Sequence, residues 1–237
     1  MSRVVLVPGF TQTAASWDGV RDELTRRHPE LEVAALDIPD ADDFTTTAAA
    51  LGAAGGHGLW VGYSLGGRLL LRLAIDHPDL VRAAILISTS PGIADPVERE
   101  ERRAADDALS EDALTLGTDR FVDRWLAQPM FAGVPDDAPG LADRATLTPK
   151  FLAHCLRDLG TGVMDPLWER LGELAVPVTI VTGSRDEKFD AIGSAMAERI
   201  RRAAHLRVEG GHALPLESPA AIAAIVAAAA HATTDRA

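Results

Sequence analysis

The sequence contains a single cysteine among its 237 residues, so Cys155 has no partner for a disulfide within the chain. Its apolar neighbours in the stretch 151–159 predict that it is buried in the core. No run of 18 apolar residues occurs, and the chain does not open with a charged segment followed by an apolar one. Neither a membrane span nor a signal peptide is therefore indicated, and a soluble, cytoplasmic protein is predicted.

Positive charge is scarce. The chain has 23 Lys and Arg against 35 Asp and Glu, which gives a formal net charge of -12. Such a balance argues against nucleic acid as a partner, because binding a polyanionic backbone needs a basic surface. No cluster of metal ligands and no nucleotide-binding loop is visible either, so no metal and no cofactor is expected.

Apolar residues are plentiful, at 47% of the chain, and they fall into short runs typical of buried strands. Helical patterns alternate with these runs, for example over 16–27 and 45–54. This alternation predicts an α/β fold with a mostly parallel sheet and helices on both faces. The predicted strands are 3–7, 31–36, 59–61, 83–87, 178–182 and 206–208.

One connection is much longer than the others. About 90 residues separate the fourth predicted strand from the fifth, far more than a crossover needs. Their pattern is mostly helical, which predicts a helical cap inserted over the strand ends. We therefore expect a core made of residues 1–90 and 171–237, and a cap made of residues 91–170. The helices expected in the cap are 95–109, 119–126 and 149–159.

The motif Gly62-x-Ser64-x-Gly66 joins the third predicted strand to a helical pattern. In a strand-turn-helix context this motif predicts a sharp turn that presents the serine as a nucleophile or proton carrier. The flanking glycines allow two backbones to pass closely. Ser64 is therefore the first candidate catalytic residue.

A serine hydroxyl needs a base, and the base needs a group that orients it. Asp186 follows the fifth predicted strand and His212 follows the sixth, in the chain order serine, aspartate, histidine. Both should lie at the carboxyl edge of the sheet, beside Ser64. Glu187 and Asp190 remain alternatives to Asp186 as the acid.

Two backbone amides are candidates for stabilising an anionic intermediate. That of Leu65 follows the serine at the start of a helix, and that of Phe10 follows Pro8-Gly9 at the end of the first predicted strand. Donors in these two places typically form an oxyanion hole. The alternative for the Pro8–Phe10 segment is a plain tight turn.

Three arginines suggest an acidic substrate. Arg68 lies one helical turn after Ser64, while Arg102 and Arg144 belong to the predicted cap. Arginine binds carboxylates through two parallel hydrogen bonds, so a pocket with several arginines favours a small polyanion. The alternative for the charged run 98–103 is a solvated helix face.

Several segments together resemble the α/β-hydrolase superfamily and, within it, the lyases of the menaquinone pathway named 2-succinyl-6-hydroxy-2,4-cyclohexadiene-1-carboxylate synthases. GYSLGG and GGH are common across the superfamily, whereas the arginine after GYSLGG and the segment LRDLGTG are more specific to these lyases. The matching segments are PGFTQTAASW (8–17), GYSLGGR (62–68), STSPGI (88–93), ERRAADDAL (101–109), FVDRWLAQPMF (121–131), LRDLGTG (156–162), PLW (166–168), GSRDEKF (183–189) and GGHALPLESP (210–219).

The resemblance implies an elimination of pyruvate from 2-succinyl-5-enolpyruvyl-6-hydroxy-3-cyclohexene-1-carboxylate. It also implies that Ser64, activated by His212 and Asp186, acts as a base. By the same resemblance the three arginines would bind the carboxylates of the substrate, and two aromatic residues, Tyr63 and Trp125, would line the pocket.

The sequence departs from the family in two places. Pro8 stands where the family usually has histidine, and the chain begins at its first parallel strand, which predicts a sheet of about six strands. Two other functions stay open: a serine carboxylesterase or carbon–carbon bond hydrolase of the same fold, and a ligand-binding protein without catalysis. The arginines favour the lyase over the first, and the serine, aspartate and histidine together argue against the second.

Overall fold

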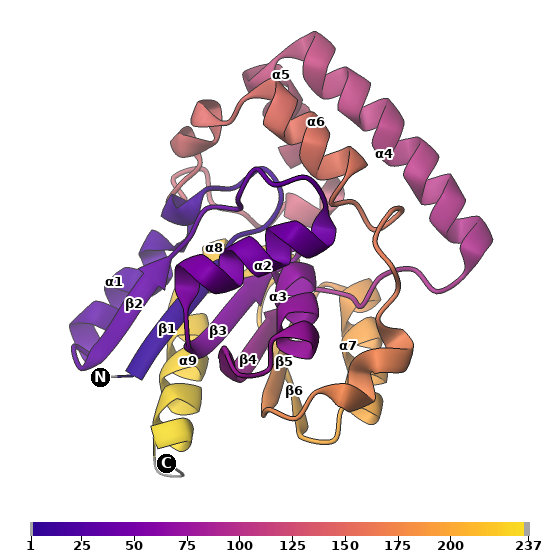
Figure 1. The fold of residues 1–237 in the computed structure, drawn as a ribbon. Helices are drawn as coiled ribbons and strands as arrows, with labels where there is room; N and C mark the ends of the chain where they lie inside the picture. The colour runs from indigo at the N-terminus through magenta and orange to yellow at the C-terminus, as the bar shows by residue number, and fades with distance from the viewer. Residues whose placement is uncertain (1, 235–237) are drawn as a thin grey trace.

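The computed structural model describes residues 2–234 and has a six-stranded parallel sheet at its centre, in the order β2-β1-β3-β4-β5-β6 (Figure 1). The predicted α/β fold with a parallel sheet of about six strands is confirmed. The strands are β1 (Ser2–Val7), β2 (Leu31–Ala35), β3 (Gly58–Tyr63), β4 (Val81–Ile87), β5 (Val178–Gly183) and β6 (Ala203–Val208).

The last strand is longer than its apolar run. β6 was expected over 206–208 but begins at Ala203. It pairs only with β5 and forms an edge of the sheet, where its residues are half-buried or exposed. An edge strand needs fewer apolar residues than a central one. His205 interrupts the apolar run, so the sequence pattern predicts only the last part of this strand.

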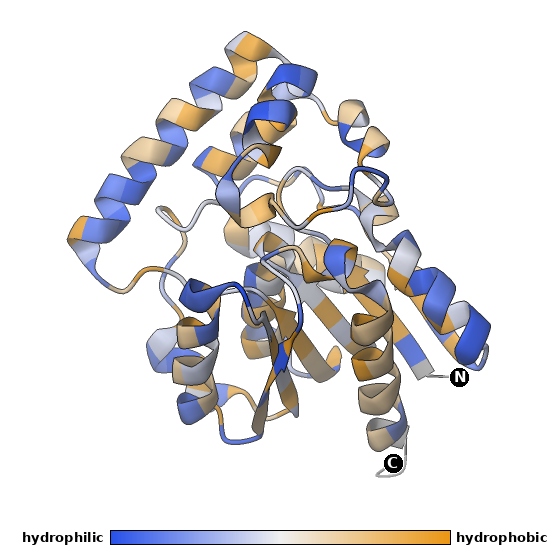
Figure 2. Cartoon of the chain, turned by 180° about the vertical axis from the view of Figure 1, so that it is seen from behind, coloured by the Kyte–Doolittle hydropathy of each residue, from blue (hydrophilic) through white to orange (hydrophobic). Residues whose placement is uncertain are grey.

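The two faces of the sheet carry separate apolar clusters because side chains alternate along each strand. In β1, Val4 and Leu6 pack on one side and Val5 and Val7 on the other. Figure 2 shows apolar strands enclosed by helices, several of which carry hydrophilic residues on their outer side. Helices α1 (Asp18–Arg27) and α9 (Pro219–Thr234) cover one face, and α2 (Phe44–Gly55), α3 (Leu65–Asp76) and α7 (Glu187–Arg199) cover the other (Figure 1).

The strand order places a crevice above the centre of the sheet. From β1 the chain moves outward to β2 and then returns past β1 to β3, after which it proceeds steadily to β6. Ligands of open α/β sheets bind where the order reverses, at the carboxyl ends of the strands. Here the reversal lies between β1 and β3, the two strands that lead to Phe10 and Ser64.

The cap lies over this edge of the sheet (Figure 1). Asp95 begins its first helix by accepting hydrogen bonds from the amides of Val97 and Glu98, and the helix ends before Gly117, which has a φ of +78°. This helix extends seven residues beyond the predicted end at 109, because no residue before Gly117 breaks it. The cap helices are α4 (Pro96–Leu116), α5 (Thr118–Leu126) and α6 (Pro149–Arg157).

Short helical turns complete the connections. They are η1 (Ala14–Trp17), η2 (Pro129–Phe131), η3 (Ala142–Thr146), η4 (Trp168–Glu173) and α8 (Leu214–Glu217). The helix expected over 16–27 thus starts as the separate turn η1 before α1. Cys155 is buried in the core, as predicted.

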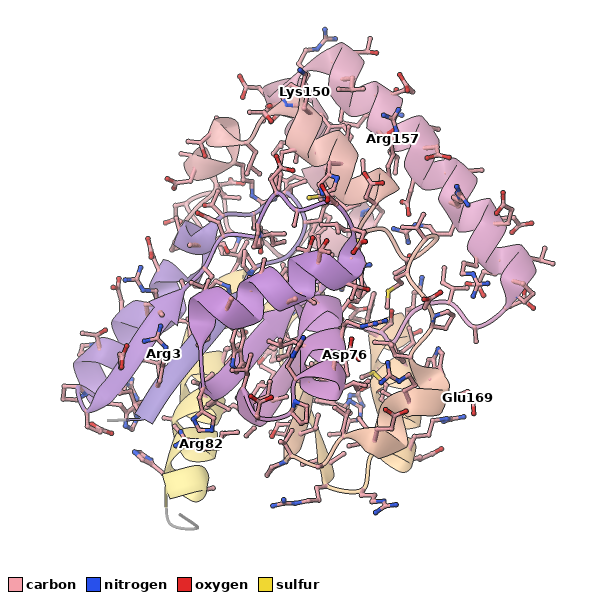
Figure 3. The ribbon with its side chains drawn as sticks, viewed as in Figure 1. Arg3, Asp76, Arg82, Lys150, Arg157 and Glu169 are labelled. Atoms are coloured by element: carbon pink, nitrogen blue, oxygen red, sulfur yellow. The ribbon has the colours of Figure 1, made fainter. Side chains whose placement is uncertain are left out.

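Charged side chains lie on the outer surface of both parts of the molecule. Lys150 and Arg157 lie on the cap, whereas Arg3 lies at the amino end of β1 (Figure 3). Within residues 2–234, no helix combines the length and apolar character that a membrane crossing requires.

The turn after β3 tolerates no side chain at Gly66. A Cβ there would lie 2.4 Å from the carbonyl oxygen of Val7 and 2.5 Å from that of Pro8. Since both obstacles are backbone atoms, we expect Gly66→Ala to lower the free energy of unfolding by about 1–3 kcal/mol. Chemical denaturation would measure the loss. Gly172→Ala is the matched control, because a Cβ at Gly172 meets nothing nearer than 4.0 Å. Equal stability of the two variants would contradict the prediction.

Candidate active site

Ser64 occupies a strained backbone position at the tip of β3. Its φ of +50° lies in the left-handed region, which is costly for a residue other than glycine. Two hydrogen bonds hold it there: its amide donates to the carbonyl of Ile87 at 2.9 Å, and the hydroxyl of Thr89 donates to its carbonyl at 2.7 Å. The turn therefore fixes the Ser64 side chain above the carboxyl ends of the strands.

His212 and Asp186 meet Ser64 from two other loops. The Nδ1–H group of His212 donates to Oδ2 of Asp186 at 2.7 Å, and the hydroxyl of Ser64 donates to Nε2 of His212 at 3.4 Å. This orientation makes Nε2 the acceptor that a general base requires. The second distance is longer than the 2.6–3.2 Å typical of proton transfer, so the two side chains must approach by a few tenths of an ångström.

Only one of the three acidic candidates contacts His212. Asp186 also caps α7 by accepting a hydrogen bond from the amide of Phe189 at 3.3 Å, which orients its other oxygen toward the histidine. Asp190 instead accepts from the hydroxyl of Thr182 at 3.0 Å and pairs with Arg207. Glu187 is exposed. The geometry thus favours Asp186 as the orienting acid.

The two amides predicted to form the oxyanion hole belong to segments at the carboxyl ends of neighbouring strands: Phe10 follows β1, and Leu65 begins α3 after β3. Among the described residues, neither the amide of Phe10 nor that of Leu65 has a hydrogen-bond acceptor. Pro8, the departure from the family, accepts a hydrogen bond from the amide of Gly66 at 3.0 Å, so its carbonyl joins β1 to the serine turn. The segment after β1 is therefore part of the site's framework and more than a plain turn.

A cavity of about 450 Å³ opens beside Ser64. All the predicted substrate-binding residues line it: Tyr63, Arg68, Arg102, Trp125 and Arg144. It also contains residues that the sequence analysis did not single out. Lys188 and Phe189 belong to the quoted segment GSRDEKF, and that proximity to Asp186 was the available signal. Gln12, Gln128 and Phe131 also line the cavity, as do the hydroxyl-bearing residues Thr89, Ser90 and Thr161.

Aromatic rings form much of the cavity wall. Phe10 packs edge-on against Trp125 with ring centroids 4.9 Å apart. Phe189 and Phe131 contact the ring of His212, at centroid distances of 4.5 Å and 6.0 Å. The phenol of Tyr63 is buried as well, and burial raises its pKa. These rings shield the imidazole from water and offer an apolar surface to a ring-shaped ligand.

Arg68 is buried, with only 9% of its surface exposed. Its Nη1 group donates to the carbonyl of Leu159 at 2.6 Å. Burial, and secondly the nearby charge of Arg102, lower the pKa of Arg68 to about 9, so it is still charged at neutral pH. Arg102 is held by Asp106, whose Oδ1 accepts from its Nε at 2.9 Å. The neighbouring Arg103 is exposed, so the alternative of a solvated face holds for Arg103 and not for Arg102.

Arg144 approaches the site from η3 and is 2% exposed. Its Nη1 group donates to the hydroxyl of Thr11, while its Nε has no hydrogen-bond partner among the described residues. Burial lowers the pKa of Arg144 to about 10. No carboxylate pairs with Arg68 or Arg144 in the described part of the chain, so the cavity holds cationic charge that an anionic ligand would neutralise.

The described residues contain one group with the side chains of a metal site. His28, Glu30 and His231 have ligand atoms within 4.8 Å of one another, on the surface. Glu30 directly precedes β2, so this group lies at the amino ends of the strands, opposite the edge that carries Ser64. It takes no part in the site described above.

Residues 4–225 match the family model described as the alpha/beta hydrolase family. The chain belongs to the alpha/beta hydrolase family. In this family the turn at Ser64, followed by the acid and then the histidine at successive strand ends, is the expected arrangement.

Two relatives within the alpha/beta hydrolase family carry the same name. The 2-succinyl-6-hydroxy-2,4-cyclohexadiene-1-carboxylate synthase of Serratia proteamaculans is 31% identical over 219 residues, which cover 85% of this chain and 84% of that protein. A Bacillus subtilis protein, provisionally given the same name, is 34% identical over 175 residues, and the match spans 70% of this chain and 63% of that relative.

The solved structure of MenH from S. aureus superposes with a TM-score of 0.88, at 27% identity, and covers 98% of this chain and 94% of that one. This likeness extends over the cap as well as the core. The resemblance inferred from sequence segments is therefore confirmed for this branch of the alpha/beta hydrolase family.

The contacts of Asp186 and Asp190 predict different effects of the same substitution. Asp186→Asn removes the charge that orients His212, so we expect Ser64 to react about 100-fold more slowly with a fluorophosphonate, as for loss of a general base. Asp190→Asn should leave the rate close to that of the wild type. Mass spectrometry of the labelled protein would give both rates. A slower reaction in Asp190→Asn than in Asp186→Asn would show that Asp190, and not Asp186, is the acid that orients His212.

The burial of Arg144 predicts a gain in stability when its charge is removed. An isolated buried charge opposes folding, and replacement by an apolar side chain of similar length is often neutral or stabilising. We expect Arg144→Met to raise the thermal midpoint by about 2–4 °C, which corresponds to about 1 kcal/mol in a chain of this size. Calorimetry would measure it, with Arg103→Met as the exposed control. A lower midpoint for Arg144→Met alone would contradict the argument.

Proposed function

We propose that this protein eliminates pyruvate from 2-succinyl-5-enolpyruvyl-6-hydroxy-3-cyclohexene-1-carboxylate and forms 2-succinyl-6-hydroxy-2,4-cyclohexadiene-1-carboxylate, a step of menaquinone biosynthesis. The observation that carries the proposal is that Arg68, Arg102 and Arg144 line one cavity with Ser64. The relatives named above provide the second support, because the Serratia proteamaculans protein bears the name of this synthase.

Ser64 acts as the base in this reaction. His212 accepts the hydroxyl proton of Ser64 at Nε2, and the oxygen of Ser64 takes the proton that lies next to the succinyl carbonyl of the substrate. Asp186 stabilises the imidazolium through the 2.7 Å hydrogen bond to Nδ1. The proton taken from the substrate thereby resides within the group of three residues.

Loss of that proton moves negative charge onto the succinyl carbonyl oxygen. The unpaired amides of Phe10 and Leu65 are the donors that stabilise it. The electrons then shift through the ring double bond and expel the enolpyruvyl oxygen, so that two conjugated ring double bonds result. The released enolpyruvate takes up a proton and becomes pyruvate. The reaction is redox-neutral, and its electrons balance without a cofactor.

The charges of the cavity match those of this substrate. The molecule carries three carboxylates, on the ring, on the succinyl chain and on the enolpyruvyl group, and the cavity has three arginines. Arginine forms bidentate pairs with carboxylates, which fix orientation as well as charge. The substrate ring can lie against Phe10 and Trp125. The core supplies the serine and Arg68, and the cap supplies Arg102, Arg144 and Trp125.

The test is to supply the substrate freshly made and to follow pyruvate release with a coupled dehydrogenase. The wild type should release pyruvate well above the spontaneous rate, and Ser64→Ala should abolish this release. Arg102→Ala should lower kcat/KM by about 100-fold, since a charge-assisted bidentate contact is worth about 3 kcal/mol. The adjacent Arg103→Ala is the matched control, because Arg103 points to solvent on the same helix.

Two outcomes would count against the lyase. Pyruvate release at the spontaneous rate by the wild type would refute the proposed reaction, and turnover of a panel of neutral acyl esters would then identify a serine carboxylesterase. Full activity in Ser64→Ala would refute the assignment of Ser64 as the base.

A further inference from the structure

Asp186 and His212 come from different loops, and one buried carboxylate contacts both loops. Glu217, at the end of α8, has a side chain that is 2% exposed. Its two oxygens accept hydrogen bonds from the amides of Gly211 at 2.7 Å and Ala213 at 3.0 Å, the residues on either side of His212. The Oε2 atom also accepts from Nη2 of Arg185 at 2.9 Å, and Arg185 precedes Asp186.

We propose that Glu217 is a positioning residue that keeps His212 within reach of Ser64 and, through Arg185, keeps the loop of His212 in register with the loop of Asp186. Glu217 makes no hydrogen bond to the side chains of Ser64, His212 or Asp186. It acts only through the backbone of the His212 loop and through Arg185. The inference rests on the role proposed above for the serine, the histidine and the aspartate.

The chemistry of the contacts requires a carboxylate. Three donors converge on Glu217, and a buried carboxylate offers two oxygens that only accept hydrogen bonds. A glutamine of the same shape would place an NH₂ group against at least one of these donors. The Ser64–His212 distance of 3.4 Å has little margin, because a further displacement would break the contact. Small movements of the histidine loop should therefore act directly on proton transfer.

The cap covers this carboxylate. A Cβ built on Gly133, which follows η2, would lie 2.2 Å from Oε2 of Glu217 and 3.1 Å from Nη2 of Arg185. Phe131, two residues earlier, contacts the ring of His212. The segment from Phe131 to Gly133 thus lies against both the imidazole and Glu217. This close approach gives a second way to disturb Glu217 without replacing it, because Gly133→Ala must displace the carboxylate or the turn.

The experiment compares two variants with two matched controls. Glu217→Gln removes the charge and one acceptor, and Gly133→Ala pushes on the intact carboxylate. Glu209→Gln makes the same chemical change on an exposed side chain of the His212 loop, and Gly172→Ala adds a methyl group where there is space. For each protein we would measure kcat and KM of pyruvate release. We would also record the far-downfield proton resonance of the His212 Nδ1–H group, assigned by its loss in His212→Ala.

We expect both test variants to melt cooperatively, to keep KM, and to lose about 100-fold in kcat, as for a small misplacement of a catalytic group. The resonance of the His212 proton should shift or broaden in both variants and stay unchanged in both controls. A merely structural role would lower the folded fraction without changing this resonance in the folded molecules.

Wild-type kcat together with an unchanged resonance in Glu217→Gln or in Gly133→Ala would overturn the proposal. If Glu217→Gln does not fold, Gly133→Ala decides alone, since it retains the glutamate. If the wild type releases no pyruvate, the proposed reaction fails, but the resonance and the rate of fluorophosphonate labelling of Ser64 still test the role of Glu217.

Discussion

The crossing of two backbones at the tip of β3 is the constraint on which the site depends. Gly62 and Gly66 allow the serine turn to pass against itself and against the end of β1, where a Cβ would meet carbonyl oxygens at 2.4–2.5 Å. This contact joins the segment that carries Ser64 and Leu65 to the segment that carries Phe10, so the proposed base and the proposed oxyanion donors come from one pair of crossing segments. Asp186 and His212 approach this crossing from the ends of β5 and β6, whereas Arg102, Arg144 and Trp125 approach it from the cap.

Electrostatics and stability oppose each other in the cavity. A chain with a net charge of -12 has buried two arginines that have no carboxylate partner among the described residues, although acidic residues are plentiful on its surface. Desolvation makes each of these cations unfavourable in the folded protein and, for the same reason, strongly attractive to an anion that reaches it. The arrangement favours ligand binding at the expense of folding free energy, which is typical of functional sites.

The sequence predicts the groups that follow strand ends and misses those that act through packing. Ser64, Asp186 and His212 could be placed because each follows an apolar run, and the parallel sheet brings such positions to one edge. Glu217 could not, because its importance comes from two amides and Arg185, which no sequence pattern records. The resemblance implied the roles of the cap arginines Arg102 and Arg144. Gln12 and Gln128 lie in the matching segments 8–17 and 121–131, but their place in the cavity depends on the tertiary path of their loops.

The insertion of the cap between two neighbouring strands has a consequence for the history of such a protein. β4 and β5 pair directly, although the whole cap separates them in the chain. The entropy lost on closing a loop grows only with the logarithm of its length, by about 0.6 kcal/mol for each doubling. A lineage can therefore lengthen, shorten or exchange this segment while the sheet and its reactive edge persist. New substrate preferences can arise there without rebuilding the groups that perform the reaction.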